Sequence, residues 1–66
     1  MFYVRYSHRG VPGIALVSTL PLALSHAHEL LEQGAEISHI EDAAGFQTMS
    51  GDEIGIHYTQ RKAGGA

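Results

Sequence analysis

The residues of this chain most suited to chemistry are His26 and His28, which stand two positions apart in the stretch LALSHAHELLEQG, residues 22–34. Two histidines can bind a metal ion or act as general bases. On a helix, however, two ligands for one metal stand three or four positions apart. Each helical residue rotates by about 100°, so His26 and His28 point to opposite sides of Ala27. We therefore interpret both as boundary residues at the edges of an apolar helix face.

The rest of the chain does not complete a catalytic or metal site. At helical spacing, Glu29 could join His26, and Glu32 could join His28, as metal ligands. Each pair supplies only two ligands, whereas zinc takes three or four from the protein. The absence of cysteine removes disulfides, thiolate zinc ligands and cysteine nucleophiles. No serine lies in a G-x-S-x-G motif, including the four candidate nucleophiles Ser18, Ser25, Ser38 and Ser50. We expect no catalytic residue, metal or cofactor, and a histidine-based or metal-dependent enzyme is the weakest of three functional hypotheses.

The histidines belong to a segment with the pattern of an amphipathic helix, from about residue 20 to residue 33. Pro21 suits its first turn, where a missing N–H costs little, and Gly34 suits the position after its end. Leu22 lies about 140° from the centre of the apolar face, toward solvent. The other apolar residues form a stripe within about 60° of Ala27 that a sheet can cover: Leu20, Ala23, Leu24, Leu30 and Leu31.

Two strands are expected before this helix. Residues 2–7, FYVRYS, alternate as a half-buried strand does, with Phe2, Val4 and Tyr6 on one face. Residues 14–19, IALVST, are apolar on both faces, which is typical of a central strand. The short Gly- and Pro-containing link between them predicts an antiparallel hairpin.

A third strand is expected at residues 35–42, AEISHIED. Ile37 and Ile40 break its alternation, which either a bulge or burial on both faces would explain. Residues 42–45, DAAG, predict a turn in which Glu41 and Asp42 are solvated.

The last segment supports two interpretations. Ser50 and Glu53 fit a capping box that starts a short helix in which Ile54 and Tyr58 share a face. The alternation of Ile54, Ile56 and Tyr58 fits a strand of a hairpin instead. We favour the helix, because the capping box is the more specific local signal.

The expected fold is therefore an α+β two-layer sandwich. An antiparallel sheet of about three strands carries one amphipathic helix on one face, in the order β-β-α-β, followed by a short helix or hairpin. Residues 1–62 form the single small domain and residues 63–66 a disordered tail.

The composition limits location and function. Arg5 and Arg9 before an apolar run imitate a secretory signal, but cleavage after Ala27 would leave only residues 28–66, fewer than usually fold unaided. No apolar run reaches the roughly 20 residues that span a membrane. We expect a cytoplasmic bacterial domain.

One helix covers one face of such a sheet, so the other face should lack cover. The alternative is a monomer in which the last segment of the chain covers that face. Tyr3 points to it, with either Ala15 and Val17 or Ile14 and Leu16. A chain of 66 residues has a thin core, and small domains often depend on a partner subunit. We expect a homodimer formed face to face or by pairing of strand edges. The expected partner contacts are Tyr3, Val17 and Leu22.

The leading functional hypothesis is a small non-catalytic module that self-associates and binds a protein or a small ligand. The alternative is weak nucleic-acid binding by the N-terminal hairpin. In that case Arg5, His8 and Arg9 would contact phosphates, and Tyr3 or Tyr6 would stack on bases. The formal net charge of −3 disfavours this alternative, because nucleic-acid-binding faces are normally basic.

Overall fold

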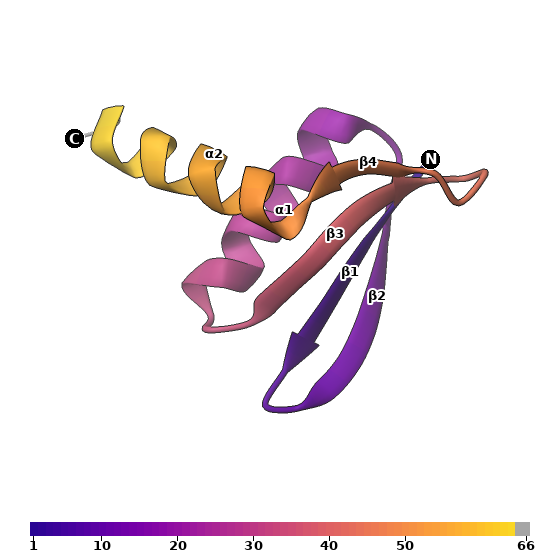
Figure 1. Ribbon diagram of the computed structural model, residues 1–66, viewed down its shortest axis with the longest axis horizontal. Coiled ribbons are helices and arrows are strands. Elements are labelled where there is room, and N and C mark those ends of the chain that lie inside the picture. The colour runs from indigo at the N-terminus through magenta and orange to yellow at the C-terminus, as the bar shows by residue number, and fades with distance from the viewer. Residues whose placement is uncertain (65–66) are drawn as a thin grey trace.

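The chain forms a four-stranded antiparallel sheet with one helix across it and a second helix continuing from the last strand (Figure 1). The computed structural model describes residues 1–64. The elements are, in order, β1 (Phe2–His8), β2 (Val11–Val17), α1 (Leu20–Glu32), β3 (Glu36–Asp42), β4 (Gln47–Ser50) and α2 (Gly51–Gly64). The strand order across the sheet is β2-β1-β3-β4. This confirms the α+β class and adds a short strand, β4, that the polar residues 47 and 48 did not indicate.

A tight hairpin joins β1 and β2, and its last pair is His8 with Val11. The two loop residues, Arg9 and Gly10, have φ angles of 54° and 79°. Two positive φ angles in a two-residue loop are those of a type I′ turn, whose twist matches that of the strands. Because this turn is so short, β2 begins at Val11, and the expected strand at residues 14–19 was placed too late.

The position of β2 in the sheet differs from the expected one. Its apolar sequence indicates a central strand, but β2 is an edge strand of the single chain. Ala15 and Val17 pack against the core beneath α1. Ile14 and Leu16 lie on the opposite face and are exposed. The central-strand prediction is therefore wrong for the isolated chain.

Helix α1 begins and ends where its local signals predict. The side chain of Thr19 caps it by accepting a hydrogen bond from the Leu22 N–H at 3.3 Å. Gly34 follows the last turn with a φ angle of 88°, a left-handed conformation that glycine adopts readily. The apolar stripe faces the sheet as expected: Ala23, Ala27 and Leu30 are buried, and Leu20, Leu24 and Leu31 pack against the core.

The last segment is a helix, not a hairpin, and the capping box is present. The Glu53 N–H donates to Ser50 Oγ at 3.2 Å, and the Ser50 N–H donates to Glu53 Oε1 at 3.3 Å. Ile54 is fully buried and Tyr58 is partly buried, as the helical interpretation requires.

Helix α2 is longer than expected, because it continues to Gly64. Ala63 is therefore helical, although we assigned residues 63–66 to a disordered tail. The last two residues of that tail, 65 and 66, lie outside the described part of the chain.

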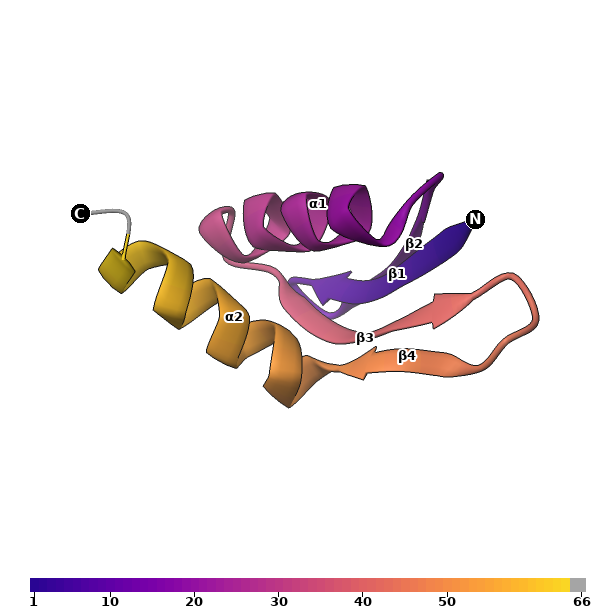
Figure 2. The same cartoon turned by 90° about the horizontal axis from the view of Figure 1, so that it is seen from above.

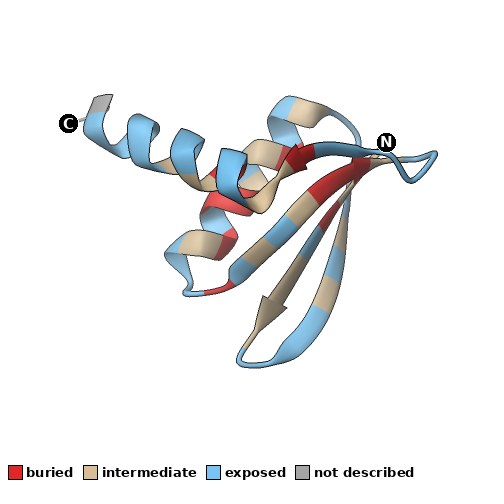
Figure 3. Cartoon of the chain, viewed as in Figure 1, coloured by how far each residue is buried: buried red, intermediate tan, exposed pale blue. Residues whose placement is uncertain are grey.

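The two faces of the sheet differ in their cover. Helix α1 contacts β1, β2 and β3, whereas α2 contacts β3, β4 and α1 and, among the described residues, neither β1 nor β2. In Figure 2, α1 runs along one side of the sheet and α2 projects beyond the end of β4. Figure 3 shows buried residues in α1, β1, β3 and β4, whereas β2 is only intermediate or exposed. Within residues 1–64, no helix thus lies over the sheet face opposite α1.

Candidate functional site

The uncovered face of the sheet, which we call the open face, gathers the residues best placed to contact a partner. Alternation along each strand and the pairing between strands place two residues of β1, two of β2 and two of β3 side by side. They are Tyr3, Arg5, Ile14, Leu16, His39 and Glu41.

The part of the open face on β2 is apolar. Ile14 is 49% exposed and Leu16 is 62% exposed. Leu16 is paired with Tyr3, so three large apolar or aromatic side chains adjoin. Single exposed leucines are ordinary, but a contiguous apolar group on an uncovered sheet is typical of an interaction surface.

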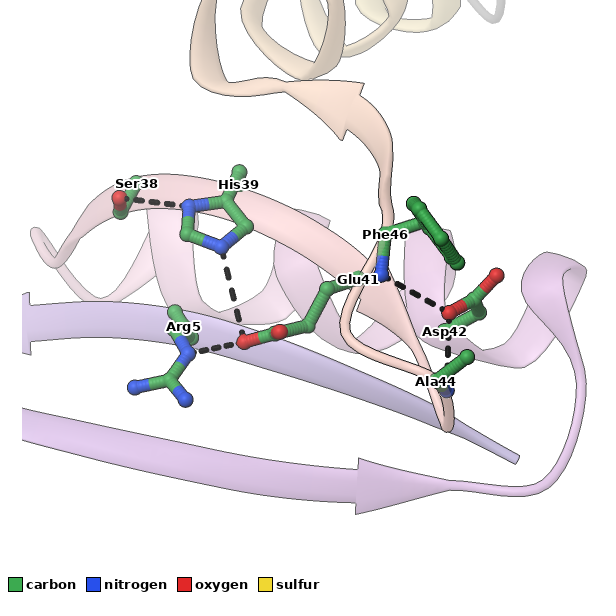
Figure 4. Close-up of polar contacts among 7 residues, drawn as sticks. All are labelled: Arg5, Ser38, His39, Glu41, Asp42, Ala44 and Phe46. Atoms are coloured by element: carbon green, nitrogen blue, oxygen red, sulfur yellow. Dashed lines mark hydrogen bonds and ion pairs between the residues drawn. The ribbon is translucent and has the colours of Figure 1, made fainter.

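The part of the open face on β1 and β3 is held by ion pairs. Glu41 Oε1 accepts a hydrogen bond from Arg5 Nε, and His39 Nε2 lies 3.6 Å from the same oxygen (Figure 4). The bond from Arg5 lowers the pKa of Glu41 below its ordinary 4.5, and the charge of Arg5 and contacts with His39 lower it further, against a smaller opposing effect of burial. Glu41 is 9% exposed, so the solvated-turn interpretation is wrong for this residue.

Asp42, by contrast, lies in the expected turn and shapes its loop. Its Oδ1 accepts hydrogen bonds from the Ala44 and Phe46 N–H groups, both at 3.0 Å (Figure 4). A carboxylate that accepts from backbone groups two and four residues ahead is a common means of shaping a loop.

A bulge in β3 brings the side chains of Ser38 and His39 into contact. Arg5 is paired with His39, but the next residue of β1, Tyr6, is paired with Ile37, so Ser38 is an extra residue. Ser38 Oγ lies 2.9 Å from His39 Nδ1. Either a bulge or burial on both faces was expected to explain the broken alternation of Ile37 and Ile40, and the bulge is present.

The order Ser38, His39, Glu41 imitates a nucleophilic triad, but its geometry favours a structural role. The distance of 3.6 Å between His39 Nε2 and Glu41 Oε1 exceeds that of a charge-assisted hydrogen bond. The Glu41 oxygen also accepts a hydrogen bond from Arg5, and Ser38 is exposed. A shallow hollow of about 710 Å³ adjoins this group at the hairpin end of the sheet; it is lined by residues of β1, β2 and β3, among them Arg5, Tyr6, Pro12, Ile14, Ile37 and Ser38.

The structure separates the predicted partner contacts. Tyr3 lies on the open face, whereas Val17 faces the α1 side and packs against the core. Leu22 is 53% exposed on α1, as expected. Val17 and Leu22 both line a groove of about 360 Å³ between β2 and α1, which also includes Ala15, Leu16, Ser25, His26 and Glu29.

The predicted nucleic-acid contacts are separated too. Arg5 is bound to Glu41 on the open face. His8 and Arg9 lie at the tip of the β1–β2 hairpin. Tyr6 faces the other side of the sheet and packs against the core. The described residues therefore do not form one basic surface with aromatic side chains in it.

His26 and His28 differ in their burial, although their spacing predicts that both lie at the edge of the apolar helix face. His26 is half-exposed and lies 3.9 Å from Glu29, as a boundary residue would. His28 is 9% exposed, because α2 covers it. Arg61 Nη1 donates to its Nδ1 at 3.1 Å, and Tyr58 lies against its ring with centroids 5.6 Å apart. Burial lowers the pKa of His28 below its ordinary 6.5, and the nearby Arg61 and His57 lower it further.

The described residues hold no group of three or more histidine, aspartate or glutamate side chains placed to bind one metal ion. Within the same part of the chain, no helix combines the length and apolar character needed to cross a membrane.

Comparison with known proteins adds no family: no protein-family model matches the chain, and no curated protein or solved structure is significantly similar to it. The function therefore has to be argued from the open face.

Sequence reasoning missed the charged half of the open face. His39 and Glu41 are two apart on a strand that pairs with Arg5, and that spacing places them on one face. The signal was present, but the strand pairing that brings Arg5 beside them is not visible in the sequence.

Proposed function

We propose that this protein is a non-catalytic interaction module that self-associates and binds protein partners through the open face of its sheet. One observation carries the proposal: Ile14 and Leu16 are exposed side by side on a sheet face that no helix of the described residues covers. The ion pair of Arg5 and Glu41 lies beside them and provides a polar rim. An apolar centre with a polar rim is the usual arrangement of a protein interface. The cytoplasmic location that we expect is compatible with such a module and stays a prediction.

Self-association can be tested by sedimentation of the full chain over a concentration series. The test variant is Leu16→Lys, and Ile56→Lys is its matched control, since Ile56 is 57% exposed on α2, away from β2. Burial of a leucine that is more than half exposed contributes about 1 kcal/mol. Because each dimer contains the site twice, Leu16→Lys should raise the dissociation constant by at least about 30-fold.

The control should sediment as the unmodified chain does. A chain that stays monomeric up to millimolar concentration would refute self-association. Equal effects of Leu16→Lys and Ile56→Lys would show that β2 is not part of the contact surface.

Nucleic-acid binding remains the second hypothesis, and the arrangement of charges disfavours it. Glu41 neutralises Arg5, and Lys62 lies 3.6 Å from Glu32. Arg61 of α2 contacts His28 of α1, whereas Arg9 lies at the tip of the β1–β2 hairpin, which α2 does not contact within the described residues. Absence of binding to any single- or double-stranded DNA or RNA at low salt, where phosphate contacts are strongest, would eliminate it.

A further inference from the structure

The free edge of β2 presents backbone groups at two residues with exposed apolar side chains. In an antiparallel pair, residues that exchange backbone hydrogen bonds alternate with residues that do not. The hairpin turn joins His8 and Val11 by such a bond. Gly13, Ala15 and Val17 are therefore bonded to β1. It follows that the N–H and C=O groups of Ile14 and Leu16 point to the free edge.

Pro12 points to the same edge but has no N–H to donate. Its presence discriminates between the ways in which two copies of β2 can pair about a two-fold axis. If Ile14 faced its own copy, each Leu16 carbonyl would face a Pro12 that cannot donate to it. If Leu16 faced its own copy, Ile14 would have to pair with Ser18, beyond the end of β2. If Ala15 faces its own copy, each Ile14 pairs with the Leu16 of the second copy, and both sets of N–H and C=O groups are satisfied.

From these features we propose that two copies of the chain pair edge to edge through β2, antiparallel, with Ala15 at the two-fold axis. The proposal rests on the proposed function, because it specifies how the module self-associates. It joins two four-stranded sheets into one continuous sheet. In that sheet β2 is a central strand, as its sequence of apolar residues on both faces indicates.

The charge and size of the contact fit a second copy. All seven residues of β2 are uncharged, so two chains of net charge −3 can meet here without direct repulsion. Natural edge strands are usually protected from pairing by charged residues or by proline. β2 carries no charge, and its one proline, Pro12, lies outside the Ile14 and Leu16 pairs of the proposed register. With the groove residues of α1, each copy contributes about a dozen residues, roughly half of those in a standard interface. The area therefore fits a weak, reversible dimer.

The second copy also changes the surfaces on both sides of the sheet. On the α1 side, the incoming strand lies along the groove between β2 and α1, where Leu22 gains a neighbour. On the open face, the cross-strand pairs extend into rows. Each row runs Glu41, Tyr3 and Leu16 of one copy, then Ile14, Arg5 and His39 of the other.

This apolar band, with an ion-paired cluster at each end, exists only in the pair. A protein partner that fits it presents an apolar strip with polar groups on both sides.

Disulfide cross-linking tests the pairing, because the unmodified chain has no cysteine and each variant then has one. The full-length variants Ile14→Cys, Ala15→Cys, Leu16→Cys and Gln60→Cys are oxidised with glutathione and separated on non-reducing gels. In the proposed pairing the two Ala15 Cα atoms lie about 4.5 Å apart, within the range that a disulfide spans. Two copies of residue 14, or of residue 16, are offset by two positions along the strands and lie beyond that range.

Ala15→Cys should therefore form dimers at least ten times faster than the other three variants. Preferential cross-linking of Ile14→Cys or Leu16→Cys would overturn the proposed register. If the unmodified chain sediments as a dimer and none of the three β2 variants cross-links faster than Gln60→Cys, edge pairing is refuted while self-association stands. If the chain is monomeric by sedimentation and no variant cross-links, both proposals fail. Circular dichroism of each variant confirms that it is folded before it is scored.

Discussion

The start of α2 lies so close to the bulge of β3 that residue 51 has to be glycine. A Cβ atom added at Gly51 would lie 2.5 Å from the Ile37 carbonyl oxygen and 2.8 Å from that of Ser38. Both oxygens belong to the backbone, so they cannot rotate away as a side chain does. We predict that Gly51→Ala destabilises the protein and displaces the bulge that positions Ser38 and His39.

The magnitude follows from a comparison with a second glycine of the same helix, one turn later. A Cβ atom at Gly55 would have no neighbour within 4 Å. Gly55→Ala should therefore stabilise α2 by the ordinary helix preference for alanine, about 0.8–1 kcal/mol. Gly51→Ala has the same preference in its favour but must move α2 from β3, and overpacking of this kind costs about 1–3 kcal/mol. We expect the free energies of unfolding of the two variants to differ by about 1–3 kcal/mol.

Urea unfolding followed by circular dichroism measures both variants against the unmodified chain. For a domain of this size, 1 kcal/mol corresponds to a change in Tm of about 4–8 °C, so thermal unfolding is a second readout. Gly55→Ala is the control for the general effect of alanine in the helix. If Gly51→Ala were as stable as Gly55→Ala, the close approach of α2 to the β3 bulge would be refuted.

Three further predictions concern the turn and the titrating groups. Arg9 holds a left-handed conformation that asparagine adopts at lower cost, so Arg9→Asn should stabilise the hairpin by about 0.5–1 kcal/mol in the same unfolding assay; lower stability would contradict the type I′ turn. The pKa of His28 is lower in the folded chain than its ordinary 6.5, so protonation favours the unfolded chain and stability should fall as the pH drops below 6.5. A pH series in which His28→Gln shows the same decline would exclude His28 as its origin. The pKa of Glu41 is also lowered, by its bond from Arg5, so its contribution is present above pH 4.5 and is lost as the pH falls below that value. Glu41→Gln should remove this loss of stability at acidic pH. If the variant loses stability over the same pH range as the unmodified chain, the pair with Arg5 does not stabilise the fold.

Several elements were predictable because their signals are local. The capping box of Ser50 and Glu53 involves residues three apart, and such neighbours meet as soon as a helix turn forms. Gly34 ends α1 and Asp42 shapes its loop for the same reason. The apolar stripe about Ala27 was correct because helix periodicity alone decides which residues share a face.

The candidate site was less predictable, because it depends on contacts between residues far apart in the sequence. Glu41 was expected in a solvated turn, but pairing of β3 with β1 brings Arg5 to it across 36 positions. His28 was expected at a helix edge, but α2 folds back over it and brings Arg61 to its ring.

By itself, the sequence determined β1, β3, α1 and the start of α2, which face of α1 is apolar, and that β2 has the composition of a central strand. Only the tertiary structure decided that β2 lies at an edge, that Ile14 and Leu16 rather than Ala15 and Val17 lie on the uncovered face, and that Glu41 is neutralised beside them. The physical reason is that periodicity and capping act between neighbours, whereas strand order depends on which distant segments pair. The conflict between the composition of β2 and its place at the sheet edge is the feature that points to a second copy of the chain.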